Sequence, residues 1–245
     1  DSSPSRGLGD VYKRQPIEET VATAKKITDQ GFKAMPHFPA RIIKDKDTLK
    51  DWIGRYQNEA GVENALLIAG GANKPYGEFD SSIQLIESEL FDKAGFKNIH
   101  IAGHPEGSKE IDPDGTTVNV DQALSWKNEF SKRTDASMAI TTQFCFDSNS
   151  VIDWANGIQK SGIDIPVHIG IAGPAKLQTL LRYSIECGVG ASIKILQKRA
   201  KDITKLLLPY KPTQIISELA AYKSSNPDFN IKKVHFFPLG GIKQV

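Results

Sequence analysis

The chain has 245 residues, of which 39% are hydrophobic and 24% are charged, and its formal net charge is +2. This length fits one α/β barrel domain or two small domains. Because the 31 basic and 29 acidic residues form no long block of one sign, the charge pattern does not favour binding to nucleic acid or to an anionic membrane. The apolar runs, such as Ala65–Ala69, are far shorter than the roughly 20 residues that a membrane span needs.

The two cysteines, Cys145 and Cys187, show no CxxC motif and no spacing typical of metal ligands. We therefore expect buried free thiols in a protein of the reducing cytoplasm. Residues Asp1–Gln15 have no apolar periodicity and look like translated adapter sequence, so we expect a non-native or disordered leader and exclude them from the fold. The chain also lacks an initiator Met, and upstream sequence is expected to be missing.

From Pro16 onward, segments with helical periodicity alternate with short apolar segments. The predicted helices span about Pro16–Gln30, Lys46–Ala60, Ser81–Ala94, Asp121–Arg133, Ser150–Ser161, Ala175–Cys187, Ile193–Leu208 and Thr213–Ser224. The predicted strands span about Phe32–Pro39, Asn64–Gly70, Asn98–Gly103, Ser137–Phe146, Ile165–Ile171 and Lys233–Leu239.

This alternation predicts right-handed βαβ units and a parallel sheet, and the continuous apolar strands indicate burial on both faces. The prediction is an α/β fold of the (β/α)8 TIM barrel type that lacks its first two strands, with residues 16–245 as one incomplete barrel domain. A doubly wound open sheet of six strands is the alternative. No GxGxxG motif follows the first strand and no GxxxxGK[ST] motif occurs, which weakens the dinucleotide-binding and P-loop interpretations.

In a barrel, the chemistry lies where the strands end, at the carboxyl-terminal face. The predicted strand ends carry histidine, glutamate, glutamine and glycine side chains that could orient a planar or phosphorylated ligand. The candidates are His37, Gly70, Gly71, His104, Glu106 and Gln143. Each has a simpler structural interpretation: the histidines and Gln143 could satisfy backbone groups, and the glycines could serve turns alone. Paired carboxylates, a Ser/His/Asp order and metal-ligand clusters are missing from the pattern.

These strand ends resemble, in order and with compatible spacing over most of Pro16–Gly241, the methylenetetrahydrofolate reductase family. The segments that carry the resemblance are Pro36-His37, Gly103-His104-Pro105-Glu106-Gly107, Ile140-Thr141-Thr142-Gln143-Phe144-Cys145-Phe146-Asp147, Val167–Ala172 and His235-Phe236-Phe237-Pro238-Leu239. The match to the family's Ile-Thr-Gln-Phe-Phe-Phe-Asp segment is the most specific of them.

The resemblance implies an FAD-dependent enzyme of one-carbon and methionine metabolism that passes hydride from NAD(P)H to 5,10-methylenetetrahydrofolate and forms 5-methyltetrahydrofolate. It implies that Gln143 contacts the folate or the nicotinamide, and that six residues lie around FAD: His37, Gly70, Gly71, His104, Glu106 and Lys132. A solvated helix face is the simpler interpretation of Lys132. The resemblance implies no metal, and it leaves homo-oligomer formation open.

The chain also departs from the family pattern. The family's Arg-Gly-Asp segment is Ala69-Gly70-Gly71 here, and its closing Leu-Asn-Arg is Leu239-Gly240-Gly241. The family's catalytic Glu lies on the first strand, which we expect this chain to lack, so no catalytic residue is assigned and the chain itself is expected to be inactive. These departures keep two alternatives open: a folate-binding protein without redox activity, and a barrel reductase that uses a deazaflavin.

Overall fold

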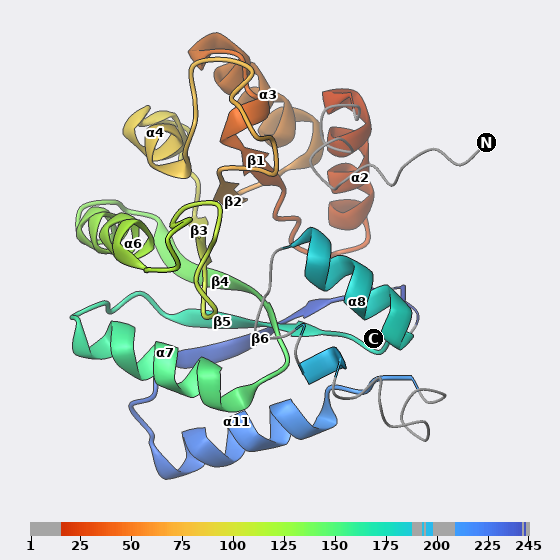
Figure 1. The fold of residues 1–245 in the computed structure, drawn as a ribbon. Coiled ribbons are helices and arrows are strands. Elements are labelled where there is room, and N and C mark those ends of the chain that lie inside the picture. The colour runs from red at the N-terminus through yellow and green to blue at the C-terminus, as the bar shows by residue number, and fades with distance from the viewer. Residues whose placement is uncertain (1–15, 188–192, 194, 198–208, 242, 244–245) are drawn as a thin grey trace. The chain divides into compact units, whose positions relative to one another are not determined.

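The computed structural model describes residues 16–187, 193, 195–197, 209–241 and 243 (Figure 1). Six strands are hydrogen-bonded in chain order into one parallel sheet. The strands are β1 (His37–Pro39), β2 (Asn64–Ile68), β3 (Asn98–Gly103), β4 (Ser137–Cys145), β5 (Val167–Ala172) and β6 (Ile231–Phe237). The predicted alternation, the six strands and the parallel sheet are therefore confirmed, and this arrangement is consistent with part of a TIM-like barrel.

Helix α2 (Ile17–Asp29) precedes β1, and the other helices that the structure describes lie between the strands in the chain, as the sequence predicts. They are η1 (Ala40–Ile42, a 3-10 turn), α3 (Lys46–Ala60), α4 (Ser82–Glu87), α5 (Leu90–Lys93), α6 (Val118–Ser131), α7 (Ser148–Lys160), α8 (Leu177–Glu186) and α11 (Thr213–Ser225). The helix predicted over Ile193–Leu208 falls largely outside the described residues.

The described chain divides into two compact units. The first unit comprises the residues up to Ala102 together with Glu129–Ala139, and the second comprises Gly103–Asn128 together with the residues from Ile140 onward. Each unit has its own apolar core.

In the first unit, the core forms around Phe38 of β1, which is fully buried. Its ring makes edge-to-face contacts with Tyr56 and Phe91, at centroid distances of 5.3 and 4.9 Å. Such pairs stabilise a core beyond the area that they bury. The helix predicted over Ser81–Ala94 is wrong as a single element, because Glu89 adopts φ 59° and separates α4 from α5.

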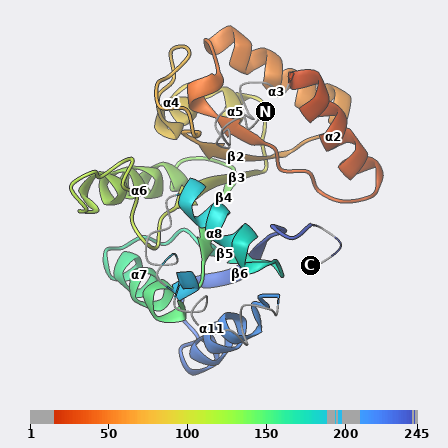
Figure 2. The same ribbon diagram turned by 45° about the vertical axis from the view of Figure 1, so that its right-hand side comes forward.

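In the second unit, β5 and β6 pack against helices on two sides. Ile169 and Ile171 of β5 contact apolar residues of α7 and α11, which lie side by side in Figures 1 and 2. The Asn156 side chain of α7 donates a hydrogen bond of 2.8 Å to the Tyr222 hydroxyl of α11. A second cluster joins Phe144 and Ala172, at the carboxyl ends of β4 and β5, to α8.

Two strands have bounds that differ from the prediction for the same reason. Strand β1 is only three residues long rather than spanning Phe32–Pro39, and β6 ends at Phe237 rather than Leu239. Pro36 precedes β1 and Pro238 follows β6, and a proline has no N–H to donate to a sheet ladder. Both cysteines are free thiols, and the expected burial is confirmed for Cys145, whereas Cys187 is only partly buried.

Candidate functional site

The second unit places His104 and Glu106 directly after β3, in the loop that leads to α6. Asp112 fixes the far end of this loop: it is buried, and its carboxylate accepts hydrogen bonds from the backbone N–H groups of Asn119 and Val120, at 3.0 and 3.1 Å. A carboxylate in this position satisfies N–H groups that the first turn of a helix leaves unpaired. The loop is therefore held against the start of α6.

Lys127 of α6 is a buried lysine that was not among the candidate site residues predicted from the sequence. It is 7% exposed, and its amine makes no hydrogen bond or ion pair with any residue that the structure describes. Burial lowers the pKa of Lys127 to about 8. The residue is buried, but its Nζ is not among the buried side-chain atoms of the described residues that lack a hydrogen-bond partner, so the amine can still meet water or an anion.

The sequence did contain a signal for Lys127. It lies three residues after Leu124 and seven after Val120, on the apolar stripe by which α6 faces the core. A lysine in an apolar stripe is unusual, because lysines are seldom fully buried without a partner. Because polar and charged residues such as Asn128 and Glu129 follow it in the sequence, Lys127 reads as part of a solvated helix face.

His104 is half-buried and lies close enough to Lys127 for the two to interact electrostatically. Burial, with a further contribution from the charge of Lys127, lowers the pKa of His104 to about 4. The imidazole is therefore neutral at physiological pH, with one nitrogen as donor and the other as acceptor. A neutral histidine beside a buried amine is suited to binding a polar ligand through directional hydrogen bonds.

Gln143 lies near the carboxyl end of β4 and is partly buried. Its side-chain oxygen Oε1 accepts a hydrogen bond of 3.1 Å from the backbone N–H of Phe144. The register between β4 and β5 shifts at this point, between Thr141 and Phe144. Such irregularities are over-represented next to active sites, where they redirect a side chain.

Glu106 and Gln143 belong to the same end of the second unit. The charge of Glu106 contributes, after the larger effect of burial, to raising the pKa of the Cys145 thiol, two residues beyond Gln143. This pKa makes Cys145 an inert thiol at neutral pH. The structure thus brings His104, Glu106 and Gln143 to the carboxyl ends of two neighbouring strands. Lys127 lies further along α6, within electrostatic range of His104.

His37, Gly70 and Gly71 lie in the first unit, at β1 and after β2. Gly70 has φ +93°, and a Cβ atom there would come within 2.9 Å of Pro39 Cβ, so this turn requires glycine. Arg41 fastens the same loop, because its side chain donates to the backbone oxygen of Ala72 at 3.0 Å and pairs with Asp80 at 2.8 Å. His37 is exposed at the first position of β1.

Lys132 lies on the surface of the first unit. Its side chain is 55% exposed and pairs with Glu129 at 2.5 Å. This placement matches the simpler interpretation of a solvated lysine, and the assignment of Lys132 to a cofactor site stays a prediction. The candidate residues thus form one set in each unit.

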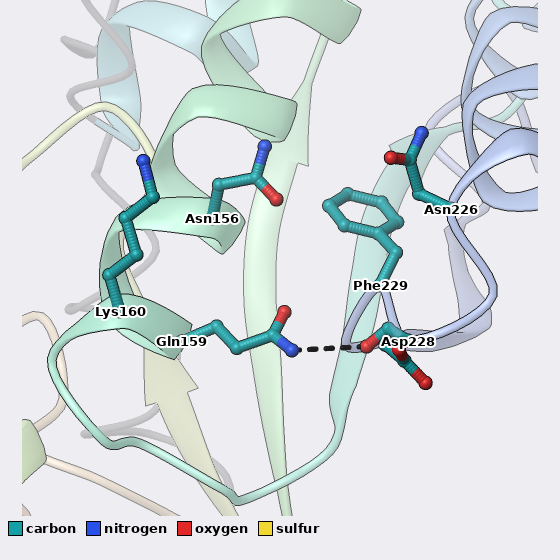
Figure 3. Close-up of a pocket in the computed structure, with 6 residues that line it drawn as sticks. All are labelled: Asn156, Gln159, Lys160, Asn226, Asp228 and Phe229. Atoms are coloured by element: carbon teal, nitrogen blue, oxygen red, sulfur yellow. Dashed lines mark hydrogen bonds between the residues drawn. The ribbon is translucent and has the colours of Figure 1, made fainter.

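A hollow of about 310 Å³ lies elsewhere in the second unit, between the end of α7 and the segment that precedes β6 (Figure 3). It is lined by Asn156, Gln159, Lys160, Asn226, Asp228 and Phe229. Gln159 donates to the backbone oxygen of Asp228 at 3.1 Å, across one side of it. The hollow is at the amino-terminal end of β6, whereas ligands of parallel α/β folds bind at the carboxyl ends.

No protein-family model matches the chain. Among the described residues, no group of three or more His, Cys, Asp or Glu side chains could hold a metal ion. Within the same residues, none of the helices has the length and apolar character that crossing a membrane requires.

Proposed function

We propose that this chain is the barrel domain of an FAD-dependent oxidoreductase similar to methylenetetrahydrofolate reductase. Such an enzyme reduces 5,10-methylenetetrahydrofolate to 5-methyltetrahydrofolate with NAD(P)H. The observation that carries the proposal is the placement of His104, Glu106 and Gln143 at the carboxyl ends of β3 and β4, where the chain resembles the family in sequence, with the amine of Lys127 within electrostatic range of His104. A TIM barrel lacking two strands and a cytoplasmic location are parts of the same proposal.

The residues present fit a phosphate-bearing flavin. Lys127 would pair with a phosphate oxygen, and the cost of burying its ammonium group would then be offset by a charge-assisted hydrogen bond. His104, neutral at physiological pH, would donate or accept a single directional hydrogen bond. FAD itself would supply the hydride chemistry. The role of Lys127 replaces the one that the resemblance gives to the exposed Lys132.

Gln143 would hold the folate substrate. With Oε1 engaged by the N–H of Phe144, its amide nitrogen has both hydrogens available for a ligand. Two donors at a fixed place orient a heterocycle that offers acceptor atoms, and orientation contributes to the rate by holding the reacting atoms together. The residue that protonates the folate is not assigned.

A second function, folate binding without redox activity, is favoured by one observation. Gly71 stands where the family has a carboxylate that contacts the flavin, and it is exposed here. A calorimetric titration separates the two functions: tetrahydrofolate binding without FAD binding supports the second, and tight FAD binding excludes it.

The test of the proposed reductase is flavin content and NAD(P)H–menadione oxidoreductase activity, which needs no folate. We expect the purified protein to bind added FAD and to show flavin absorbance and this activity. The Lys127→Met variant should bind FAD at least about tenfold more weakly, because one charge-assisted hydrogen bond is lost.

The matched control is Lys132→Met, which removes an exposed lysine five positions further along the chain. It should bind FAD like the wild type. A protein with neither flavin absorbance nor menadione activity would contradict the proposal, and a defect in Lys132→Met alone would return the phosphate contact to Lys132.

A further inference from the structure

Strand β4 contains one residue more than its partner over a short stretch. Thr141 is opposite His168 and Phe144 is opposite Gly170, so three steps along β4 match two steps along β5. This is the pattern of a β-bulge, and the extra residue lies at Thr142–Gln143. The bulge therefore coincides with the glutamine that we assign to the folate.

The hydroxyl group of Thr142 ties the bulge to β5. Thr142 is 1% exposed, and its Oγ1 accepts a hydrogen bond of 2.8 Å from the backbone N–H of Gly170. The same hydroxyl donates to the backbone oxygen of Gln143, also at 2.8 Å. The side chain thus supplies the acceptor that a backbone carbonyl provides in a regular ladder, and the buried N–H of Gly170 stays paired.

Gly170 makes room for the bulge. A Cβ atom at this position would lie 2.5 Å from the backbone oxygen of Thr142 and 2.6 Å from that of Gln143. Both oxygens belong to backbone and cannot rotate away as a flexible side chain could. Any side chain at position 170 would push the two strands apart at the bulge.

The bulge in turn determines which hydrogen-bonding groups of the Gln143 side chain are available to a ligand. Oε1 is held by the N–H of Phe144 at 3.1 Å, and Nε2 makes no hydrogen bond with any residue that the structure describes. A half-buried amide with both N–H groups available would bind an edge that carries acceptors, such as a carbonyl oxygen or an unprotonated ring nitrogen.

We propose that Thr142 and Gly170 are positioning residues, which hold Gln143 so that its two N–H groups meet the acceptor edge of the pterin ring. The inference rests on the proposed function for the identity of the ring, whereas the bulge itself does not depend on it. Thr142 and Gly170 do not contact the substrate in this account and act only through Gln143.

The test compares three variants of the full chain with FAD added. Thr142→Val keeps the shape of the side chain and removes the hydroxyl, Thr142→Ser keeps the hydroxyl, and Gln143→Glu replaces the donating amide with a group that only accepts when ionised. Calorimetry measures the affinity for tetrahydrofolate and, separately, for FAD.

We expect Thr142→Val and Gln143→Glu to weaken tetrahydrofolate binding about tenfold, the loss that corresponds to one hydrogen bond, with FAD affinity unchanged within about twofold. Thr142→Ser should restore the wild-type affinity. A general structural defect would lower both affinities and would not be rescued by serine. Wild-type affinity in Thr142→Val or in Gln143→Glu would overturn the inference.

A second measurement separates the inference from the proposed function. Amide hydrogen exchange at Gly170 should become much faster in Thr142→Val and stay slow in Thr142→Ser, whatever ligand the protein binds. Unchanged exchange in Thr142→Val overturns the positioning role. If the wild type binds FAD but not tetrahydrofolate, the inference falls and the flavin assignment stands; if it binds neither, the proposed function falls.

Discussion

Lys127 and His104 are two basic side chains that lie near each other in the second unit and that both have lowered pKa values. Burial is the main cause for each, and it disfavours the charged form. Neither group contributes to stability in this state. Titratable residues whose burial reduces stability are typical of binding sites, because a bound ligand can supply the partner that the protein lacks.

Removing the buried amine should therefore stabilise the folded protein. The pKa of Lys127 is lowered from 10.5 to about 8, so the charged form is disfavoured by about 3 kcal/mol at pH 7. We expect Lys127→Met to raise the free energy of unfolding by up to this amount in urea denaturation. Lys132→Met, at an exposed position, should change it by less than about 0.5 kcal/mol. A destabilised Lys127→Met protein would show that the amine has a structural partner.

His104 should make the protein sensitive to acid. Its folded-state pKa of about 4 is below the ordinary 6.5, so the unfolded chain takes up the proton first as the pH falls. The folded state therefore loses about 3 kcal/mol of stability between about pH 6.5 and 4, and this loss is absent above pH 6.5. In denaturation experiments over this pH range, the wild type should lose about 3 kcal/mol more stability than His104→Gln as the pH falls. Equal losses in the two proteins would contradict the assignment.

At the scale of the elements, the bulge in β4 and the glycine in β5 form a matched pair. Gly170→Ala should lower the free energy of unfolding by about 1–3 kcal/mol, the range for an atom forced into a filled space. The control is Gly157→Ala in α7, where a Cβ atom would meet nothing within 4 Å. That change should stabilise the helix by about 0.5–1 kcal/mol. Equal effects in thermal unfolding would contradict the packing described here.

Periodicity predicted most of the elements because their local signals agree with the tertiary fold. Helix α3 shows this agreement: Asp45 accepts from the N–H of Thr48 at its start, and Gly61 ends it with φ 62°. The division of the helix over Ser81–Ala94 could not be predicted, because nothing in the residue type of Glu89 favours a left-handed conformation.

The candidate site could be predicted only in part. Residue type and strand-end position identify His104 and Gln143, because the apolar strand pattern shows where each strand ends and ligands of parallel α/β folds bind at those ends. They could not identify the bulge, which depends on a contact between Thr142 and Gly170, 28 residues apart in the chain. Residue type and position also could not predict that Lys127 is buried and Lys132 is exposed, since this difference follows from how α6 packs.

At the scale of the whole molecule, the described chain is an α/β protein with a parallel six-stranded sheet and two compact units. The chemistry-bearing residues of the second unit gather where β3 and β4 end. In the first unit, Gly70 and Arg41 instead hold the conformation of the loop that follows β2. The candidate residues with the more specific surroundings therefore lie in the second unit.

The most direct test of the proposed flavin site compares the affinities of FAD and riboflavin, which share the ring system, whereas FAD carries a diphosphate and an adenosine in addition. Calorimetric titration of the wild type should give tighter binding of FAD than of riboflavin, by at least about tenfold, and this difference should shrink by about tenfold in Lys127→Met while Lys132→Met retains it. Equal affinity of the wild type for the two compounds, or no binding of either, would contradict the account.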